Sequence, residues 1–356
     1  MKNVAIVTCI GKSNFGNRLQ NYALQKVIED LGCNVETLEN ISYLNNIDNY
    51  EENYKEYLEY KKEKDIRDYS NRFRIAYFDE FDKNVKFRDG MVTALDLNAT
   101  GYDYYVVGSD QVWNPHHGKL KDLDLLVGID DSKRISYAAS IGIDELPESV
   151  KDKAKKEWLR FKAISVREDK GKEIIEELTG RSDVQVNLDP TMLLTDEEWS
   201  KLAKRPKQLK NDKYILNYFL GELSEQRKNE IERIAKENDC EIINILDKNG
   251  EFYETGPSEF LYLEKNAFLI CTDSFHSSVF SILFNRPFIV FNREDINKSM
   301  NSRIDTLINT FKLTNRNYEG KITEDNLNHD YSEAYKILDS KRMEAKEYLK
   351  NALGDE

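Results

Sequence analysis

The sequence predicts an α/β protein built from two domains that face a cleft. Three observations lead to this prediction. The chain has 356 residues, which is more than one ordinary hydrophobic core accommodates. Short apolar segments alternate with segments of helical periodicity in both halves of the chain. Polar residues follow the ends of several predicted strands, at the edge where open α/β sheets bind their ligands.

The first half opens with a buried strand at residues 4–8, a helix at 17–31 that ends before Gly32, and a second strand at 35–38. A charged stretch with tyrosines at helical spacing follows at 43–96, and we interpret it as an inserted helical segment that packs on the main body. Beyond it the pattern predicts a helix at 148–161 and strands at 104–107, 135–138, 163–166 and 184–187.

The second half repeats this alternation after a polar, basic stretch at 201–212, which contains Pro206 and which we interpret as a linker. The pattern there predicts strands at 214–219, 241–246, 268–271 and 288–291, and helices at 224–237, 275–284, 302–311 and 331–348. We therefore expect an N-terminal domain at 1–200 that carries the insertion, and a C-terminal domain at 213–356. The last helix can pack back on the first domain.

Composition excludes several classes of function. A net charge of −13 argues against nucleic acid, although local arginines and helix N-termini can still hold an anionic substrate. No apolar run reaches the roughly 18 residues of a membrane helix, and the N-terminus lacks the apolar core of a signal peptide. The four cysteines show no CxxC spacing, and with the four histidines they form no zinc pattern. We expect a reduced, cytoplasmic protein without a metal.

The most informative segment runs from Cys271 to Phe291 and predicts a strand, a turn and a helix. His276 falls in the first turn of that helix. A helix N-terminus at the carboxyl end of a strand suits an anionic substrate, and a proton-transfer side chain there can meet a phosphate or carboxylate. For a histidine taken alone, the cap of a core helix is the commoner role.

Three other segments place polar residues after a strand. The loop from Gly11 to Gln20 has two glycines, but Asn17-Arg18 follows Gly16, so this is not a P-loop for ATP. The segment from Gly108 to Asn114 offers polar groups for a sugar or carboxylate, and Trp113 either stacks on a sugar ring or belongs to the core. Arg167 either binds a carboxylate or phosphate or forms a salt bridge with the neighbouring Glu168 or Asp169.

In this order, the segments resemble the polysaccharide pyruvyl transferase family. The resemblance spans about residues 10–305, with the charged insertion outside it. It is carried by the residues from Asn14 to Leu24, Gly108 to Trp113, Ser165 to Glu168, Asp189 to Thr191 and Thr272 to His276.

The resemblance implies two Rossmann-like domains around a cleft, similar to GT-B glycosyltransferases. It implies transfer of the enolpyruvyl unit of phosphoenolpyruvate to two hydroxyls of a glycan sugar, which gives a pyruvate ketal and phosphate. No cofactor is expected. The expected setting is cell-surface or exopolysaccharide biosynthesis, with an acceptor that can be lipid-linked and an enzyme that can associate peripherally with a membrane.

The expected site combines residues from both halves of the chain. His276 and Asp110 are the expected catalytic residues, although Asp273 can also act as the base or, like Ser274, cap the helix. Ser274 stands where many family members have an arginine, so the second positive charge must come from elsewhere, with Arg18 and Arg303 as candidates. The expected donor-binding residues are Arg167, Ser274, Phe275, Ser277, Ser278, Arg18 and Arg303, and the expected acceptor-binding residues are Asn14, Gly16, Asn17, Ser109, Gln111 and Trp113.

Two alternatives stay open. One is a GT-B-type glycosyltransferase that uses a nucleotide sugar, which would share the two-domain cleft and the helix-terminus phosphate site. The other is a protein that binds a glycan or nucleotide without catalysis. A screen that compares phosphoenolpyruvate consumption with nucleotide release separates the first alternative from the pyruvyl transferase. A His276→Ala substitution that has no effect on function would favour the second alternative.

Overall fold

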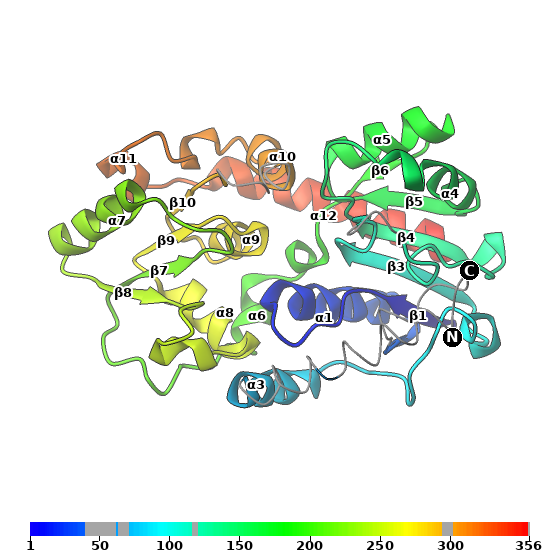
Figure 1. Ribbon diagram of the computed structural model, residues 1–356, viewed down its shortest axis with the longest axis horizontal. Helices are drawn as coiled ribbons and strands as arrows, with labels where there is room; N and C mark the ends of the chain where they lie inside the picture. Colours follow the sequence, from blue (N-terminus) through cyan, green and yellow to red (C-terminus); the bar gives the residue numbers. More distant parts are fainter. Residues whose placement is uncertain (40–61, 63–70, 116–119, 294–301, 355–356) are drawn as a thin grey trace. The chain divides into compact units, whose positions relative to one another are not determined.

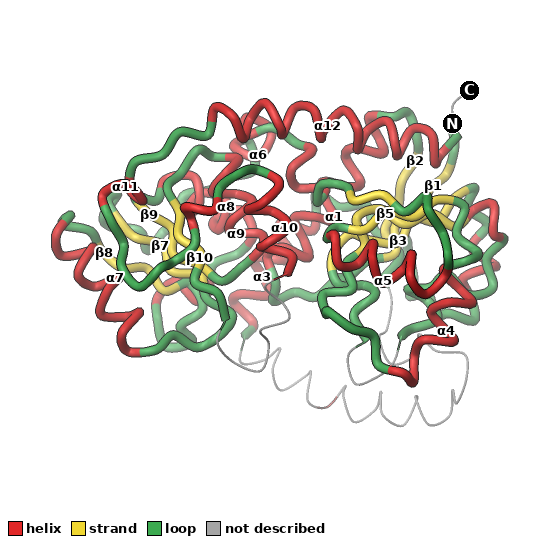
Figure 2. The backbone as a smooth tube through the Cα atoms, turned by 90° about the horizontal axis from the view of Figure 1, so that it is seen from above, coloured by secondary structure: helices red, strands yellow, loops and turns green. Residues whose placement is uncertain are grey.

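A computed structural model describes residues 1–39, 62, 71–115, 120–293 and 302–354. The chain divides into two compact units. The first comprises Met1–Leu193 together with Lys341–Glu356, and the second comprises Leu194–Ser340. In each unit the strands lie inside and helices lie outside (Figure 2). None of the helices among the described residues is long and apolar enough to cross a membrane.

The first unit is built on a parallel sheet with the strand order β2-β1-β3-β4-β5-β6 (Figure 1). Because β1 lies between β2 and β3, the chain turns from one side of the sheet to the other at this point, which is where doubly wound sheets bind ligands. The strands are β1 Asn3–Val7, β2 Asn34–Thr37, β3 Tyr104–Asp110, β4 Arg134–Ala139, β5 Ala163–Val166 and β6 Gln185–Val186. The helices are α1 Phe15–Asp30, α3 Arg72–Asp82, α4 Glu148–Trp158 and α5 Asp169–Thr179.

Helix α1 begins at the switch point because Asn14 caps it. The Asn14 side chain accepts a hydrogen bond from the backbone N–H of Asn17 at 3.3 Å. The helix ends before Gly32, whose φ of 82° is a left-handed conformation that favours glycine. Between these ends its apolar face is fully buried through Phe15, Leu19, Leu24 and Ile28. The cap therefore fixes the start of α1 beside the ends of β1 and β3.

The second unit repeats the arrangement on a smaller scale. Its parallel sheet has the order β10-β9-β7-β8, so that its first strand again lies between its second and third. The strands are β7 Tyr214–Tyr218, β8 Glu241–Asn244, β9 Leu269–Thr272 and β10 Phe288–Val290. The helices are α6 Asp196–Ser200, α7 Glu225–Glu237, α8 Pro257–Asn266, α9 Phe275–Leu283, α10 Ser302–Thr310 and α11 Glu324–Leu327, and α12 Ser332–Leu353 runs from the second unit into the first.

The predicted strands all form, with ends displaced by up to three residues. Helices α5 and α8 were not predicted. Of the predicted insertion, α3 is helical as expected, whereas residues 40–61 and 63–70 lie outside the described residues.

The limits of the two units differ from the domain limits expected from the sequence. The stretch at 201–212, which we interpreted as a linker, lies within the second unit, where the backbone N–H of Lys204 bonds to the carbonyl of Ser258 at 2.9 Å. The chain from Lys341 onward belongs to the first unit. There the Tyr348 hydroxyl donates to the carbonyl of Ser136 at 2.8 Å, and Arg342 donates to the carbonyl of Met192.

Candidate functional site

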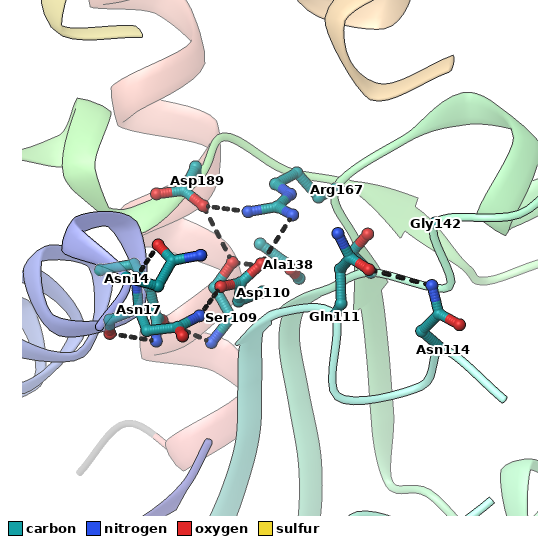
Figure 3. Close-up of polar contacts among 12 residues, drawn as sticks. Asn14, Asn17, Ser109, Asp110, Gln111, Asn114, Ala138, Gly142, Arg167 and Asp189 are labelled. Atoms are coloured by element: carbon teal, nitrogen blue, oxygen red, sulfur yellow. Dashed lines mark hydrogen bonds and ion pairs between the residues drawn. The ribbon is translucent and has the colours of Figure 1, made fainter. Parts of the chain in front are cut away.

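Polar residues gather at the carboxyl edge of the first sheet around Arg167, which follows β5 (Figure 3). Its Nη1 donates to Asp189 Oδ2 at 2.7 Å, and its Nη2 donates to Asp110 Oδ1 at 3.1 Å. The side chain is 1% exposed. Burial lowers the pKa of Arg167, but Asp110 and Asp189 outweigh this effect, and the pKa lies above its ordinary value. One buried guanidinium is thus shared by two carboxylates.

The two carboxylates have further partners that hold them in place. Asp110 Oδ2 accepts from the Asn17 side chain, which belongs to α1. Asp189 Oδ1 accepts from the backbone N–H of Thr191 at 3.0 Å and from its hydroxyl at 2.7 Å. The Ser109 hydroxyl donates to Asp189 Oδ2 at 3.1 Å. The predicted residues Asn17, Ser109, Asp110 and Arg167 therefore form one network, joined by Asp189.

Glu168 has a different role from the salt bridge that we considered for it. Its Oε1 accepts hydrogen bonds from the backbone N–H groups of Ile141 at 2.8 Å and Gly142 at 3.0 Å, in the loop after β4. Gly142 has a φ of 65°, and a Cβ there would lie 3.1 Å from the Asn114 side chain. Asn114 in turn donates to Gln111 Oε1 at 2.9 Å. Glu168 thus orders the loop beside Gln111.

The structure corrects the acceptor role of Trp113. The indole is fully buried, donates to the carbonyl of Asp124 at 2.8 Å, and packs against Trp158 and Phe161 with ring centroids 5.3 and 5.5 Å away. A sugar has no access to either face of this ring. Trp113 belongs to the core of the first unit.

Arg18 connects two helices of the first unit. Its side chain is 1% exposed, its Nε lies 2.6 Å from Asp82 Oδ1 of α3, and it donates to Asn21 and to the carbonyl of Ile10. Burial lowers its pKa, and Asp82 opposes that shift. These contacts make Arg18 a support for α1 and α3, which does not favour the donor-binding role that we considered. Gly16 is buried within α1.

The carboxyl edge of the second sheet carries a second network around Asp273, which follows β9. Its carboxylate accepts from the backbone N–H groups of Leu220 and Gly221, each at 2.7 Å, in the loop after β7. Arg293, which follows β10, donates its Nε–H to Asp273 Oδ2 at 3.0 Å. Asp273 therefore joins the loop after β7 to Arg293 after β10, and this role leaves it poorly placed as a catalytic base.

The first turn of α9 lies directly after this network. Ser274 is the N-cap, since its hydroxyl accepts from the backbone N–H of Ser277 at 3.5 Å. His276 is 6% exposed, and its ring meets Phe275 edge-on. Of the two caps that the sequence allowed, Ser274 is the one that forms.

The hydroxyls of Ser277 and Ser278 point into the unit. Both residues are fully buried; Ser277 donates to Glu264 Oε1 at 2.5 Å and Ser278 donates to the carbonyl of Ser274 at 3.0 Å. The two hydroxyls are thus used inside the unit, and the donor contact that we expect from the backbone N–H groups of Phe275 to Ser278 stays a prediction. Arg303 lies in the first turn of α10 and is buried.

Two residues of these networks, Asp189 and Arg293, were absent from the expected site. Each follows a predicted strand, which is the same signal that pointed to Asp110 and Arg167. Among the described residues, no group of three or more His, Cys, Asp and Glu side chains could hold a metal ion.

Two solved structures resemble the fold. UDP-GlcNAc 2-epimerase from Methanocaldococcus jannaschii is 12% identical, with a TM-score of 0.50, and the match covers 95% of this chain and 92% of that one. A putative UDP-N-acetylglucosamine 2-epimerase from Listeria monocytogenes is 11% identical, with the same TM-score of 0.50. That match covers 98% of this chain and 90% of the other. At this identity the likeness concerns the fold alone. With the two parallel sheets it confirms the predicted α/β fold with Rossmann-like units, as in GT-B proteins.

No curated protein sequence matches the chain. The sequence model described as polysaccharide pyruvyl transferase matches residues 14–295, which is well over half of the chain. This range includes both networks, from the cap of α1 to Arg293 after β10. The chain belongs to the polysaccharide pyruvyl transferase family.

Proposed function

We propose that the protein transfers the enolpyruvyl group of phosphoenolpyruvate to two hydroxyls of a glycan sugar and releases phosphate. Membership of the family supports this reaction class. The observation that carries the proposal is the second carboxyl edge, where a histidine in a capped helix turn follows an aspartate–arginine pair. A cation and a helix N-terminus suit an anionic donor, and an imidazole can supply a proton.

The reaction needs a proton at the methylene carbon of the donor while a sugar hydroxyl attacks the adjacent carbon. Phosphate then leaves, a second hydroxyl adds to the same carbon, and the ring closes. The sugar hydroxyls release two protons in total. One proton corresponds to the one that the methylene carbon gains when it becomes a methyl group, and the other is taken up by the released phosphate. His276 is the proposed proton donor, and it can take a proton back from the second hydroxyl.

Ser274 stands where many family members have an arginine, and we propose that Arg293 supplies the positive charge in its place. Arg293 follows β10, at the same sheet edge as α9, and its Nε–H donates to Asp273 Oδ2. An arginine can hold a phosphate or carboxylate through two parallel hydrogen bonds. Arg303 stays a prediction for the same role.

The first network is proposed to serve the acceptor. Arg167 is bonded to two carboxylates, so an anionic donor would compete with Asp110 and Asp189 for it. The carboxylate oxygens of this cluster can instead accept hydrogen bonds from neutral hydroxyls. Asp110 is the proposed base, with Asn14, Asn17, Ser109 and Gln111 as acceptor contacts. The acceptor is proposed to be a cytoplasmic, lipid-linked precursor of a cell-surface polysaccharide.

A donor screen tests the proposal. The wild-type protein is incubated with phosphoenolpyruvate and a panel of glycan acceptors, and phosphate release and the mass of the ketal product are measured. Parallel reactions contain nucleotide sugars in place of phosphoenolpyruvate. Acceptor-dependent phosphate release with a ketal product supports the proposal. Nucleotide release without consumption of phosphoenolpyruvate would instead favour a glycosyltransferase.

A further inference from the structure

Glu264 is a fully buried carboxylic acid of α8 that faces the first turn of α9. Its Oε1 accepts a hydrogen bond from the Ser277 hydroxyl at 2.5 Å, and Ser277 is fully buried as well. Its Oε2 is buried and has no hydrogen-bond partner among the residues that the structure describes. An acid with a single neutral partner in such a place is unusual, because buried polar groups are normally fully bonded.

The surroundings of Glu264 favour its uncharged form. Within the described parts of the chain no lysine or arginine bonds to it. The titratable group of another element that interacts with Glu264 is Tyr214 of β7, and Tyr214 in turn lies near Tyr262, Arg286 and Arg205. Burial raises the pKa of Glu264 well above its usual value, and the Ser277 hydroxyl lowers it by less. These surroundings favour the protonated carboxyl.

Ser277 links this acid to the functional helix turn. Its hydroxyl bonds to Glu264, while its backbone N–H bonds to the hydroxyl of the N-cap, Ser274. His276 lies between these two serines in the chain. The contact between Glu264 and Ser277 therefore fixes the turn from which the imidazole projects. A displacement of about 1 Å can cost roughly 10²-fold in rate when a catalytic group is misplaced.

We propose that Glu264, in its protonated form, is a positioning residue for His276, because it anchors Ser277 and thereby sets the start of α9. For its effect on turnover, the inference rests on the proposed function. The effect on the structure around His276 is independent of it.

The direction of the pH dependence follows from the raised pKa. In the unfolded chain a glutamate ionises near its ordinary pKa of about 4.3, so folding must return a proton to Glu264 at higher pH. The neutral acid thus contributes its full stability below that value, and the contribution is lost as the pH rises toward the folded pKa. Ionisation would also place a charge beneath the first turn of α9.

Three variants test the proposal. Glu264→Gln keeps an acceptor for Ser277 but cannot ionise, Glu264→Met removes the acceptor, and Glu259→Gln is a control in the first turn of α8. The measurements are kcat and donor KM across mildly acidic to alkaline pH, thermal stability across the same range, and the NMR signal of the His276 imidazole without substrate, assigned with His276→Gln.

We expect Glu264→Gln to keep wild-type kcat at neutral pH, to lose less activity than the wild type on the alkaline side, and to gain thermal stability relative to it as the pH rises. We expect Glu264→Met to shift the His276 signal and to lower kcat about tenfold or more, with a smaller change in donor KM. Glu259→Gln should leave the His276 signal and kcat unchanged.

Three results would overturn the assignment: an identical alkaline profile in the wild type and Glu264→Gln, a stability difference that does not depend on pH, or an unmoved His276 signal in Glu264→Met. The Gln variant alone decides the question if the Met variant does not fold. If the wild type does not consume phosphoenolpyruvate, the proposed function fails, while the NMR and stability measurements still test Glu264.

Discussion

At the carboxyl edge of the first sheet Arg167 lies between Asp110 and Asp189, whereas at the edge of the second sheet Arg293 contacts Asp273. Each network includes residues at the switch point of its sheet, Asp110 at the end of β3 in the first and Asp273 after β9 in the second. In the first, carboxylates outnumber the arginine. In the second, aspartate and arginine are balanced, and the N-terminus of α9 adds a partial positive charge.

We propose that this difference assigns different ligands to two similar edges. A site with surplus carboxylate favours neutral hydroxyl groups and can accept their protons. A site with a balanced ion pair and a helix N-terminus favours an anion. Under this proposal the same strand order serves two ligands, and the charged residues after each strand distinguish them. Each prediction below changes one residue of one edge.

The largest effect is expected from the second edge. His276→Ala should lower kcat by about 10²–10⁴-fold, because it removes the proposed proton donor, and should leave folding largely intact. Steady-state phosphate release and a thermal melt check both parts. His329→Ala is the matched control, since His329 is only half-buried and its imidazole bonds to the carbonyl of Asn285. Near-wild-type turnover in folded His276→Ala would remove this residue from the mechanism.

The next effect is on stability and comes from the first edge. Arg167→Met should destabilise the protein by about 3–5 kcal/mol, because Asp110 and Asp189 would be left buried without their cation. Chemical denaturation measures the change. Arg160→Met is the control: Arg160 is more exposed and pairs with Asp131, so its loss should cost at most about 1 kcal/mol. Equal losses in the two variants would mean that the first network is not a buried unit.

The smallest effect concerns the cap of α9. Ser274→Ala should cost about 1 kcal/mol in unfolding free energy, since one backbone N–H of the first turn loses its acceptor. Thr195→Ala, at the capping box of α6, is the comparison and should cost a similar amount. Donor KM should change little in Ser274→Ala. A rise as large as that caused by losing an arginine would show that the Ser274 hydroxyl itself holds the donor.

Much of the fold follows from local patterns in the sequence. Strands such as 163–166 were predicted because they are short apolar runs, and α9 because Phe275, Val279 and Ile282 recur at helical spacing. Helix α8 was missed, although Gly256-Pro257 marks its start, because its buried face includes a glutamate. A carboxyl that is buried as a neutral acid has no counterpart in a pattern of polar and apolar residues.

The site was predictable to the extent that it depends on position along the chain. Asp110, Arg167 and His276 were predicted as site residues because each follows a strand, and the structure places them at strand ends; the Ser274 cap was one of two that the sequence allowed. Partners that are distant in sequence were not predictable. The partners of Arg167 lie 57 and 22 residues away, and no local signal chose them over the adjacent Glu168. The acceptor role predicted for Trp113 was wrong for the same reason, since Trp158 and Phe161, which pack against it, come from another part of the chain.

The measurement that tests the comparison most directly is the affinity for phosphoenolpyruvate of the wild type, Arg293→Gln and Arg167→Lys, determined by calorimetric titration without acceptor. Arg227→Gln is the control, because Arg227 also lies in the second unit and bonds to the carbonyl of Asn292. Hydrogen bonds to charged groups contribute about 1.5–3 kcal/mol, so Arg293→Gln should weaken binding roughly tenfold or more. Arg167→Lys and Arg227→Gln should bind nearly as the wild type does. A loss of binding in Arg167→Lys together with unchanged binding in Arg293→Gln would contradict the assignment of the donor to the second edge.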